Sequence, residues 1–124
     1  SLRFKKSVQN SWKNLKNCLV DLKKKKKKIV AYGASAKAGT ISRCAKIGRE
    51  LVDFYIDDSP SKQGLYSPIY HVPIISRKEA FKKKIDYILI LAVNYADIIM
   101  KKEKKFKLNG GKFIIPRGEE IQIL

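Results

Sequence analysis

The chain has little of what a metal site or a nucleophilic catalytic site needs. It has one histidine, His71, and two cysteines, Cys18 and Cys44, which lie far apart without partners at metal-ligand spacing. No serine or cysteine near the histidine lies in a recognisable nucleophile elbow. We therefore expect no metal site and no catalytic residue in this chain, and two reduced, packed thiols as in a cytoplasmic protein.

Long apolar runs are also missing. No stretch approaches the roughly 20 apolar residues that a membrane helix needs. Lysine and asparagine interrupt the first apolar positions, so we expect no signal peptide. We expect no membrane partner and a cytoplasmic location. The 124 residues suffice for one domain with a real core, and because the chain begins with Ser1, a fragment of a longer protein is an open alternative.

Acidic residues and arginine are scarce beside lysine. The formal net charge is +17, and lysine supplies 23 of the 28 basic residues. Residues 1–28 carry a net charge of +10 and residues 29–124 only +7, so most of the excess belongs to the leading segment. Arginine dominates specific base contacts, and abundant lysine with isoleucine is what AT-rich coding gives. A basic nucleic-acid-binding protein stays an alternative, but nucleic acid is not the partner we expect.

The apolar pattern predicts a helix followed by repeated strand–helix units. Apolar residues at helical spacing, among them Phe4 and Val8, predict an amphipathic helix over 4–22. We expect lysines 23–28 to form its solvated end or a linker, and a phosphate-binding or membrane-binding patch is the alternative. We expect strands at 29–32, 51–56, 87–93, 113–115 and 121–124, a short edge strand at 71–74, and helices at 38–47, 76–83 and 94–107. Ser76 opens a Ser-x-x-Glu capping box, Asn94 is a candidate N-cap, and Pro116 is expected to end its strand. The residues expected to face inward from the helices are Ile41, Cys44 or Ala45, Ile98, Ile99 and Phe106.

This order predicts an α/β fold: a Rossmann-like, doubly wound, mainly parallel sheet with helices on both faces. We expect residues 1–28 to form the lead helix and lysine-rich linker, and residues 29–124 to form the Rossmann-like domain. Ligands of such sheets bind beyond the carboxyl ends of the strands. Three segments fall at those ends: the loop 33–40, the turn 57–64 and Asn94.

The loop after the first strand combines small residues with a serine and a lysine, Ser35 and Lys37, and leads into a helix. Small residues let the backbone approach a ligand, and a helix N-terminus favours an anion. Against the G-x-G-x-x-G fingerprint the loop offers Gly33, Ser35 and Ala38, with Asp57 near the expected ribose-binding acid, so an NAD site would be degraded. The ending of a P-loop is missing. Tight packing without a ligand is the remaining alternative.

Five ordered segments carry a resemblance to a known family: Tyr32–Lys37, Asp57–Pro68, His71–Ile74, Asn94–Asp97 and Gly110–Pro116. Together they resemble the C-terminal domain of SAM-dependent sugar C-methyltransferases. The chain departs from the family pattern at Ala38-Gly39 and at Tyr70. The resemblance implies a Rossmann-like domain that follows a zinc-binding domain and a SAM-binding domain, here supplied upstream or as separate chains.

The resemblance also implies a role. The chain would help to bind the diphosphate of a nucleotide-sugar, while catalysis and SAM, the cofactor expected for the parent enzyme, belong to another domain. No cofactor is then expected in this chain. The implied substrate contacts are Gly33, Ser35, Lys37, Asp57, Lys62, Gln63, His71 and Asn94. A free-standing nucleotide-binding or CoA-type binding module on the same fold is the alternative.

Overall fold

The computed structural model describes the backbone of residues 2–67 and 70–124, and all the side chains of these residues except 2–9, 36 and 37. Within these residues, six strands form one sheet. The strands are β1 (Ile29–Tyr32), β2 (Tyr55–Ile56), β3 (Ile74–Ile75), β4 (Tyr87–Ile90), β5 (Lys112–Arg117) and β6 (Glu120–Ile123). The helices are α1 (Leu2–Lys24), α2 (Ala36–Cys44), α3 (Arg77–Ala80), the 3₁₀ helix η1 (Val93–Tyr95), α4 (Ala96–Lys102) and α5 (Lys104–Leu108).

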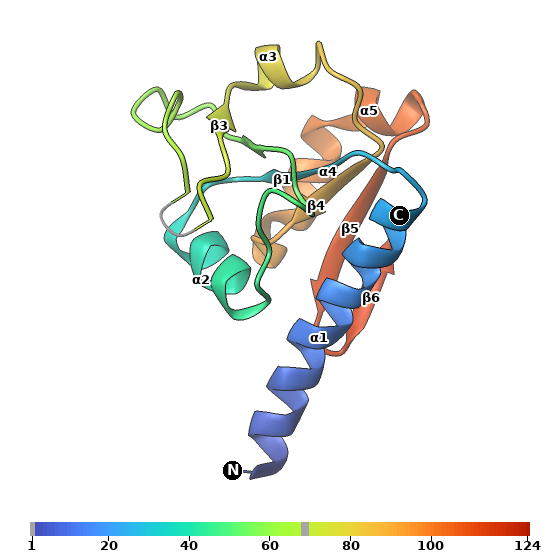
Figure 1. Ribbon diagram of the computed structural model, residues 1–124. Helices are drawn as coiled ribbons and strands as arrows, with labels where there is room; N and C mark the ends of the chain where they lie inside the picture. The colour runs from blue at the N-terminus through green and yellow to red at the C-terminus, as the bar shows by residue number, and fades with distance from the viewer. Residues whose placement is uncertain (1, 68–69) are drawn as a thin grey trace.

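The strand order in the sheet is β3-β2-β1-β4-β5-β6 (Figure 1). β1 lies between β2 and β4, where Ala31 is opposite Tyr55 on one side and Leu89 on the other. All neighbouring strands up to β5 are parallel, and β6 is antiparallel to β5. This is the doubly wound, mainly parallel sheet that the sequence predicts, so the fold class is confirmed.

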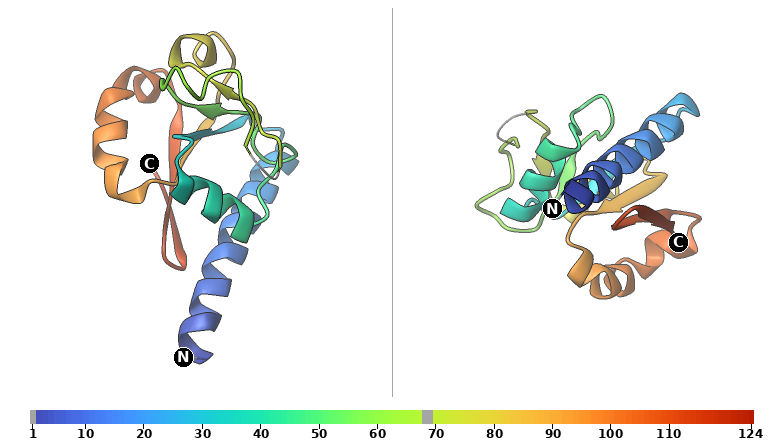
Figure 2. Two further views of the ribbon diagram at one scale, coloured as in Figure 1. Left: turned by 90° about the vertical axis from the view of Figure 1, so that its left-hand side faces the viewer. Right: turned by 90° about the horizontal axis from the view of Figure 1, so that it is seen from below.

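The two faces of the sheet bury separate hydrophobic cores. Ile29 and Ala31 of β1 face one core and Val30 and Tyr32 face the other, as the period of two in a strand requires. α1 and α2 cover the first face, and α3, α4 and α5 lie over the second (Figure 2). Because both faces of β1 and β4 are covered, these strands are apolar throughout.

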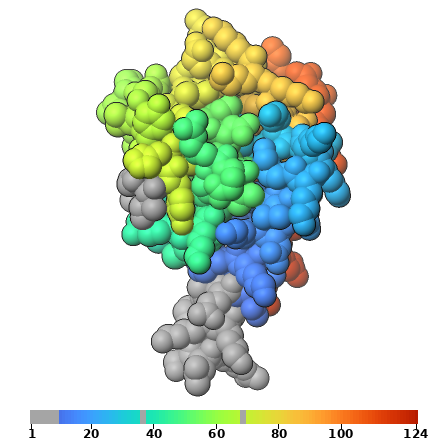
Figure 3. Space-filling model, viewed as in Figure 1, coloured from blue at the N-terminus to red at the C-terminus, as the bar shows by residue number. Residues whose placement is uncertain are grey.

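Helix α1 shares the first core with the sheet. Its leucines Leu15, Leu19 and Leu22 are buried in the same cluster as Ile29. The space-filling view shows the described part of α1 directly against the rest of the chain (Figure 3). The side chains of Phe4 and Val8, which begin the predicted stripe, lie outside the described residues. The division into residues 1–28 and 29–124 stays a prediction.

Several predicted boundaries are wrong for local reasons. β2 has two residues where a strand over 51–56 was expected, because the N–H groups of Leu51 and Val52 turn back to the carbonyl of Gly48. α2 ends at Cys44, ahead of the expected 47, because Lys46 adopts a left-handed backbone with φ of 56°. β4 ends at Ile90 rather than 93, where the chain turns toward η1.

The helix expected over 94–107 is divided into η1, α4 and α5. Glu103, with φ of −100° and ψ of 31°, separates α4 from α5. The N-cap of α4 is Tyr95 and not Asn94, and no side chain bonds the helix start there. Ile99 is buried as expected, because it faces the sheet. Ile98 is 66% exposed, so it does not face the core as expected.

Of the other expectations about single residues, some are confirmed and some are wrong. Ser76 caps α3 by accepting the Glu79 N–H at 3.2 Å, as the capping box predicts. Ala45 and not Cys44 faces inward, and Cys44 is an exposed thiol rather than a packed one. β5 continues through Pro116, because Pro116 lies opposite Ile121 at a position where antiparallel strands exchange no hydrogen bonds.

Among the described residues, no helix is long and apolar enough to cross a membrane.

Candidate functional site

The candidate site is a pocket at the carboxyl ends of β1, β2 and β4. β2 and β4 flank β1 on opposite sides, so the strand order reverses beside β1. The pocket lies at this switch point, where such sheets bind ligands. The pocket has a volume of about 550 Å³. Its lining residues are Tyr32, Gly33, Ala34, Ser35, Asp57, Lys62, Ala92, Asn94, Tyr95, Ile98, Ile99 and Lys102.

Asp57, directly after β2, holds the loop that follows β1. Its carboxylate accepts the backbone N–H of Ala34 at 2.9 Å and that of Ser59 at 2.8 Å. Burial raises the pKa of the Asp57 carboxyl, but these N–H groups and the Lys62 ammonium outweigh it, so the pKa lies below its ordinary value. The carboxylate is therefore ionised at neutral pH and fixed in position.

Lys62 closes the polar side of the pocket. Its Nζ donates to the Ala34 carbonyl at 3.0 Å and lies 3.9 Å from the Asp57 carboxylate. The lysine thus bridges the turn after β2 and the loop after β1. Because its side chain is 40% exposed, the ammonium remains within reach of a ligand anion.

Gly33 gives the loop its path. Its φ of +87° lies in a region that L side chains rarely adopt, and its N–H binds the Ile56 carbonyl at 2.8 Å. A Cβ there would meet no atom within 4 Å. The backbone conformation rather than crowding therefore requires glycine at this position.

Ser35 caps the helix that starts at the pocket. Its Oγ accepts the N–H of Ala38 at 3.1 Å, and its own hydroxyl hydrogen remains free to donate. The first N–H groups of α2 have no partner within the helix and carry its partial positive charge. The side chain of Lys37, also expected here, lies outside the described residues.

The opposite wall comes from η1 and α4 and is largely apolar. Tyr95 is 61% exposed and Ile98 is 66% exposed, three residues apart at the mouth of the pocket. Asn94 and Lys102 also line this side. Tyr95 lines the pocket although it was not among the predicted contacts, and Ile98 lies here although its spacing predicts a place in the core. The apolar spacing cannot distinguish a core face from a pocket wall when both lie on one short helix.

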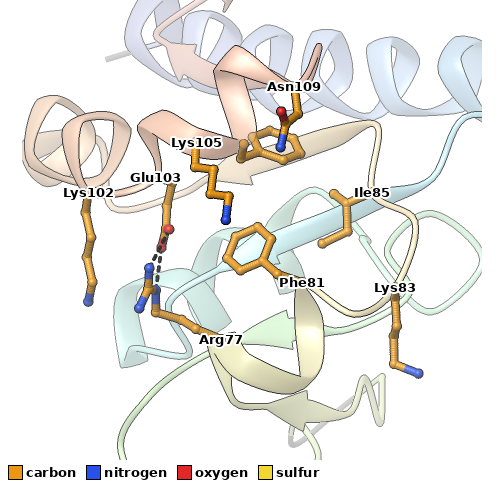
Figure 4. Close-up of a pocket in the computed structure, with 10 residues that line it drawn as sticks. Arg77, Phe81, Lys83, Ile85, Lys102, Glu103, Lys105 and Asn109 are labelled. Carbon is orange, nitrogen blue, oxygen red and sulfur yellow. Dashed lines mark hydrogen bonds and ion pairs between the residues drawn. The ribbon is translucent and has the colours of Figure 1, made fainter.

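A buried carboxylate lies behind this wall. Glu103 is 3% exposed, and both of its oxygens accept hydrogen bonds from Arg77, each at 2.7 Å (Figure 4). The hydroxyl of Tyr32, which lines the pocket, donates to the same carboxylate. Burial and Glu103 raise the pKa of Tyr32. Burial also raises the pKa of Glu103, but the bonds from Arg77 and Tyr32 lower it below its ordinary value.

The predicted site residues whose side chains are described either line the pocket or lie outside it. The residues that meet in the pocket are Gly33, Ser35, Asp57, Lys62 and Asn94. Gln63 lies outside it and donates from its amide to the Asp57 carbonyl at 3.4 Å. His71 is exposed in a left-handed turn with φ of 52° and does not line the pocket. Within the described residues, no group of three His, Cys, Asp or Glu side chains is placed to hold a metal.

Comparisons with known proteins find a relative of similar sequence and a solved structure of similar fold. The chain is 38% identical over 93 residues to the C-methyltransferase NovU of Streptomyces niveus, which covers 75% of this chain and 22% of that protein. The chain thus spans about a fifth of that relative. Its fold is similar to UDP-D-quinovosamine 4-dehydrogenase from Vibrio fischeri, with a TM-score of 0.50 over 79% of this chain and 93% of that one. At 17% identity, this likeness shows the fold alone.

The family itself follows from a match along nearly the whole chain. Residues 2–117 match the family described as the C-methyltransferase C-terminal domain. The matched range includes every strand that lines the pocket, together with α1. The chain therefore belongs to the C-methyltransferase C-terminal domain family.

Proposed function

We propose that this domain binds a nucleotide-sugar through its diphosphate, for a methyl transfer carried out by another part of the parent enzyme. The observation that carries the proposal is the pocket at the switch point, where Lys62 and the capped N-terminus of α2 lie on one side. A diphosphate is the ligand that a helix N-terminus and a lysine favour together. Residues 29–124 would form the substrate-binding domain behind the lead segment 1–28.

The two walls of the pocket suit the two parts of such a ligand. On the polar wall, Ser35 donates its hydroxyl hydrogen and Lys62 its charge to phosphate oxygens, and Lys37 follows on the same helix start. On the apolar wall, Tyr95 and Ile98 offer a surface for the planar base. Asp57 and Asn94 supply an acceptor and an amide for hydroxyl groups. Gln63 and His71 remain candidate contacts of the same ligand, outside the pocket itself.

SAM fits this pocket poorly. Its sulfonium is a cation, whereas the charged residues that line the pocket are Lys62, Lys102 and a single carboxylate, Asp57. That carboxylate already accepts two N–H groups and lies beside Lys62. We therefore assign SAM to the parent enzyme and derive no step of the reaction from residues of this chain. The SAM-binding and zinc-binding domains would act from upstream or as partner chains, in the cytoplasm.

Thermal denaturation with UDP, dTDP, CDP and GDP tests the proposal. A ligand at 100 times its Kd adds about 2.7 kcal/mol to the free energy of unfolding, so at least one diphosphate should raise the Tm clearly. NAD should raise it less. A chain whose Tm responds to none of the four diphosphates contradicts the proposal.

Ser35→Asp separates binding from folding. Aspartate caps a helix as well as serine does, so the Tm of the free variant should stay close to that of the wild type. Its carboxylate repels a phosphate at the same place, so the shift caused by the diphosphate should disappear. Ser61→Asp, in the exposed turn after β2, adds the same charge outside the pocket and should keep the shift.

A further inference from the structure

A second cavity of about 500 Å³ lies on the other side of the Arg77–Glu103 pair (Figure 4). Its walls come from α3, the segment that follows it, and the α4–α5 helices. The pocket at the switch point and this cavity have only Lys102 in common among their lining residues. A cavity of this size is within the range of small-molecule sites, about 300–1,000 Å³.

One wall of the cavity is aromatic and held in place from behind. Phe81 is 37% exposed, and its ring lies 6.1 Å from that of Phe106. Phe106 packs edge-on against the buried Phe113 at 5.4 Å, and a Cβ on Gly111 would lie only 2.3 Å from the Phe106 ring. The close approach to Gly111 fixes Phe106, and Phe106 in turn supports Phe81. More than a third of the Phe81 side chain is thus kept exposed in the wall of the cavity.

Most of the charged residues that line the cavity are cationic. Lys83, Lys102 and Lys105 line it, and the described residues contain no ion pair of theirs. The Arg77 charge is matched by Glu103, so the lysines leave the cavity with a net charge of +3. Lys105 reaches from α5 into the space between Phe81 and the Arg77–Glu103 pair, while Lys83 and Lys102 point away at the rim (Figure 4).

We propose that this cavity is a second binding site, for a small anion that carries a planar ring, such as a nucleoside monophosphate. The ring would stack on Phe81, because aromatic faces accept any planar base. The anionic group would pair with Lys105, and the rim lysines would add to the attraction. The fixed Arg77–Glu103 pair forms a rigid floor between this ligand and the pocket at the switch point.

An NMR titration of the whole chain with AMP tests the proposal. We expect saturable shifts of signals around Phe81, Phe106 and Lys105. Lys105→Ala should weaken binding by up to about fivefold, as for an exposed ion pair. Phe81→Leu, which keeps an apolar side chain but removes the ring, should weaken it by at least about fivefold. Lys107→Ala, an exposed lysine of α5 outside the cavity, is the matched control and should leave the affinity unchanged.

Several results of these experiments would overturn the proposal. Shifts that do not saturate, or an equal loss from Lys105→Ala and Lys107→Ala, mean that AMP meets only a diffuse positive surface. Saturable shifts confined to Gly33, Ser35 and Asn94 mean that AMP binds the first pocket instead. Ser35→Asp separates the two proposals, because it should abolish diphosphate binding and leave AMP binding at Phe81 intact. Adenosine and inorganic phosphate, each alone, should bind more weakly than AMP, and equal affinity for either one contradicts the two-part site.

Discussion

The Asp57 carboxylate accepts the backbone N–H of Ala34 at 2.9 Å, so the end of β2 holds the loop that follows β1. The same carboxylate accepts the N–H of Ser59. We expect Asp57→Ala to lower the free energy of unfolding by about 1–3 kcal/mol, because the partly buried N–H of Ala34 loses its acceptor. Urea denaturation at pH 7 measures this. Glu119→Ala, an exposed acid in the turn before β6, should change it by no more than about 0.5 kcal/mol.

An Asp57→Ala variant with the same unfolding midpoint as the wild type would contradict this expectation. The loop would then hold its conformation without the carboxylate. Lys62, which donates to the Ala34 carbonyl at 3.0 Å, would be the remaining tie between the two segments.

Two glycines of the same segment should respond to alanine in opposite directions. Gly33 has φ of +87° with open space at its Cβ position, so Gly33→Ala adds backbone strain of about 1–2 kcal/mol and no clash. Gly39 lies inside α2 with ordinary φ and equally open space, so Gly39→Ala should stabilise the chain by about 0.5–1 kcal/mol. Differential scanning calorimetry should show one Tm falling and the other rising. Shifts of the same sign would contradict the assigned loop conformation.

The Glu103 network predicts how stability depends on pH. The folded-state pKa of Glu103 lies below its ordinary value of 4.5, so the ionised carboxylate stabilises the fold above that value. This stability is lost as the pH falls through the folded-state pKa. Glu103→Gln should lower the free energy of unfolding at pH 7 by about 1–3 kcal/mol, because Arg77 loses a charged partner. The variant should also lose less stability than the wild type between pH 7 and pH 3.

A matched control for this prediction is Glu79→Gln. Glu79 pairs with Lys82 at 3.4 Å on the surface of α3, where an ion pair contributes little, so the variant should follow the wild-type pH profile closely. Asp57, whose pKa is also lowered, keeps part of the acid sensitivity in both variants. Parallel profiles for wild type and Glu103→Gln would mean that Glu103 does not contribute to the acid-sensitive part of the stability.

The sequence predicts those parts of the molecule that depend on local pattern. The buried run of β1, the glycine that follows it and the Ser76 cap are all signalled by neighbouring residues, and the structure has them where expected. The alternation of strands and helices predicts the fold class, but not the order of the strands in the sheet. Five predicted contact residues also reach one pocket, because the carboxyl ends of parallel strands meet there.

The parts that local pattern misses depend on how different segments pack against one another. Tyr32 and Arg77 meet at Glu103, a residue that lies among lysines in what looks like an uninterrupted helix. Ile98 resembles a core residue by spacing, but it lies at the mouth of the pocket. Pro116 stays in its strand because β6 pairs with it at a position that needs no N–H. Each of these features depends on how segments pack together, which the pattern within one segment does not predict.

Helix α1 should prove necessary for the stability of the sheet. Leu19 is fully buried in the core that also contains Ile29 and Ile114. Leu19→Ala should therefore lower the free energy of unfolding by about 2–5 kcal/mol, the cost of lost burial and a residual cavity. Asn17→Ala, exposed on the same helix, should leave it within about 0.5 kcal/mol of the wild type. Urea denaturation followed by circular dichroism measures both variants. A near-neutral Leu19→Ala would mean that residues 1–28 fold apart from 29–124, whereas a large loss makes α1 part of the unit that holds the pocket in shape.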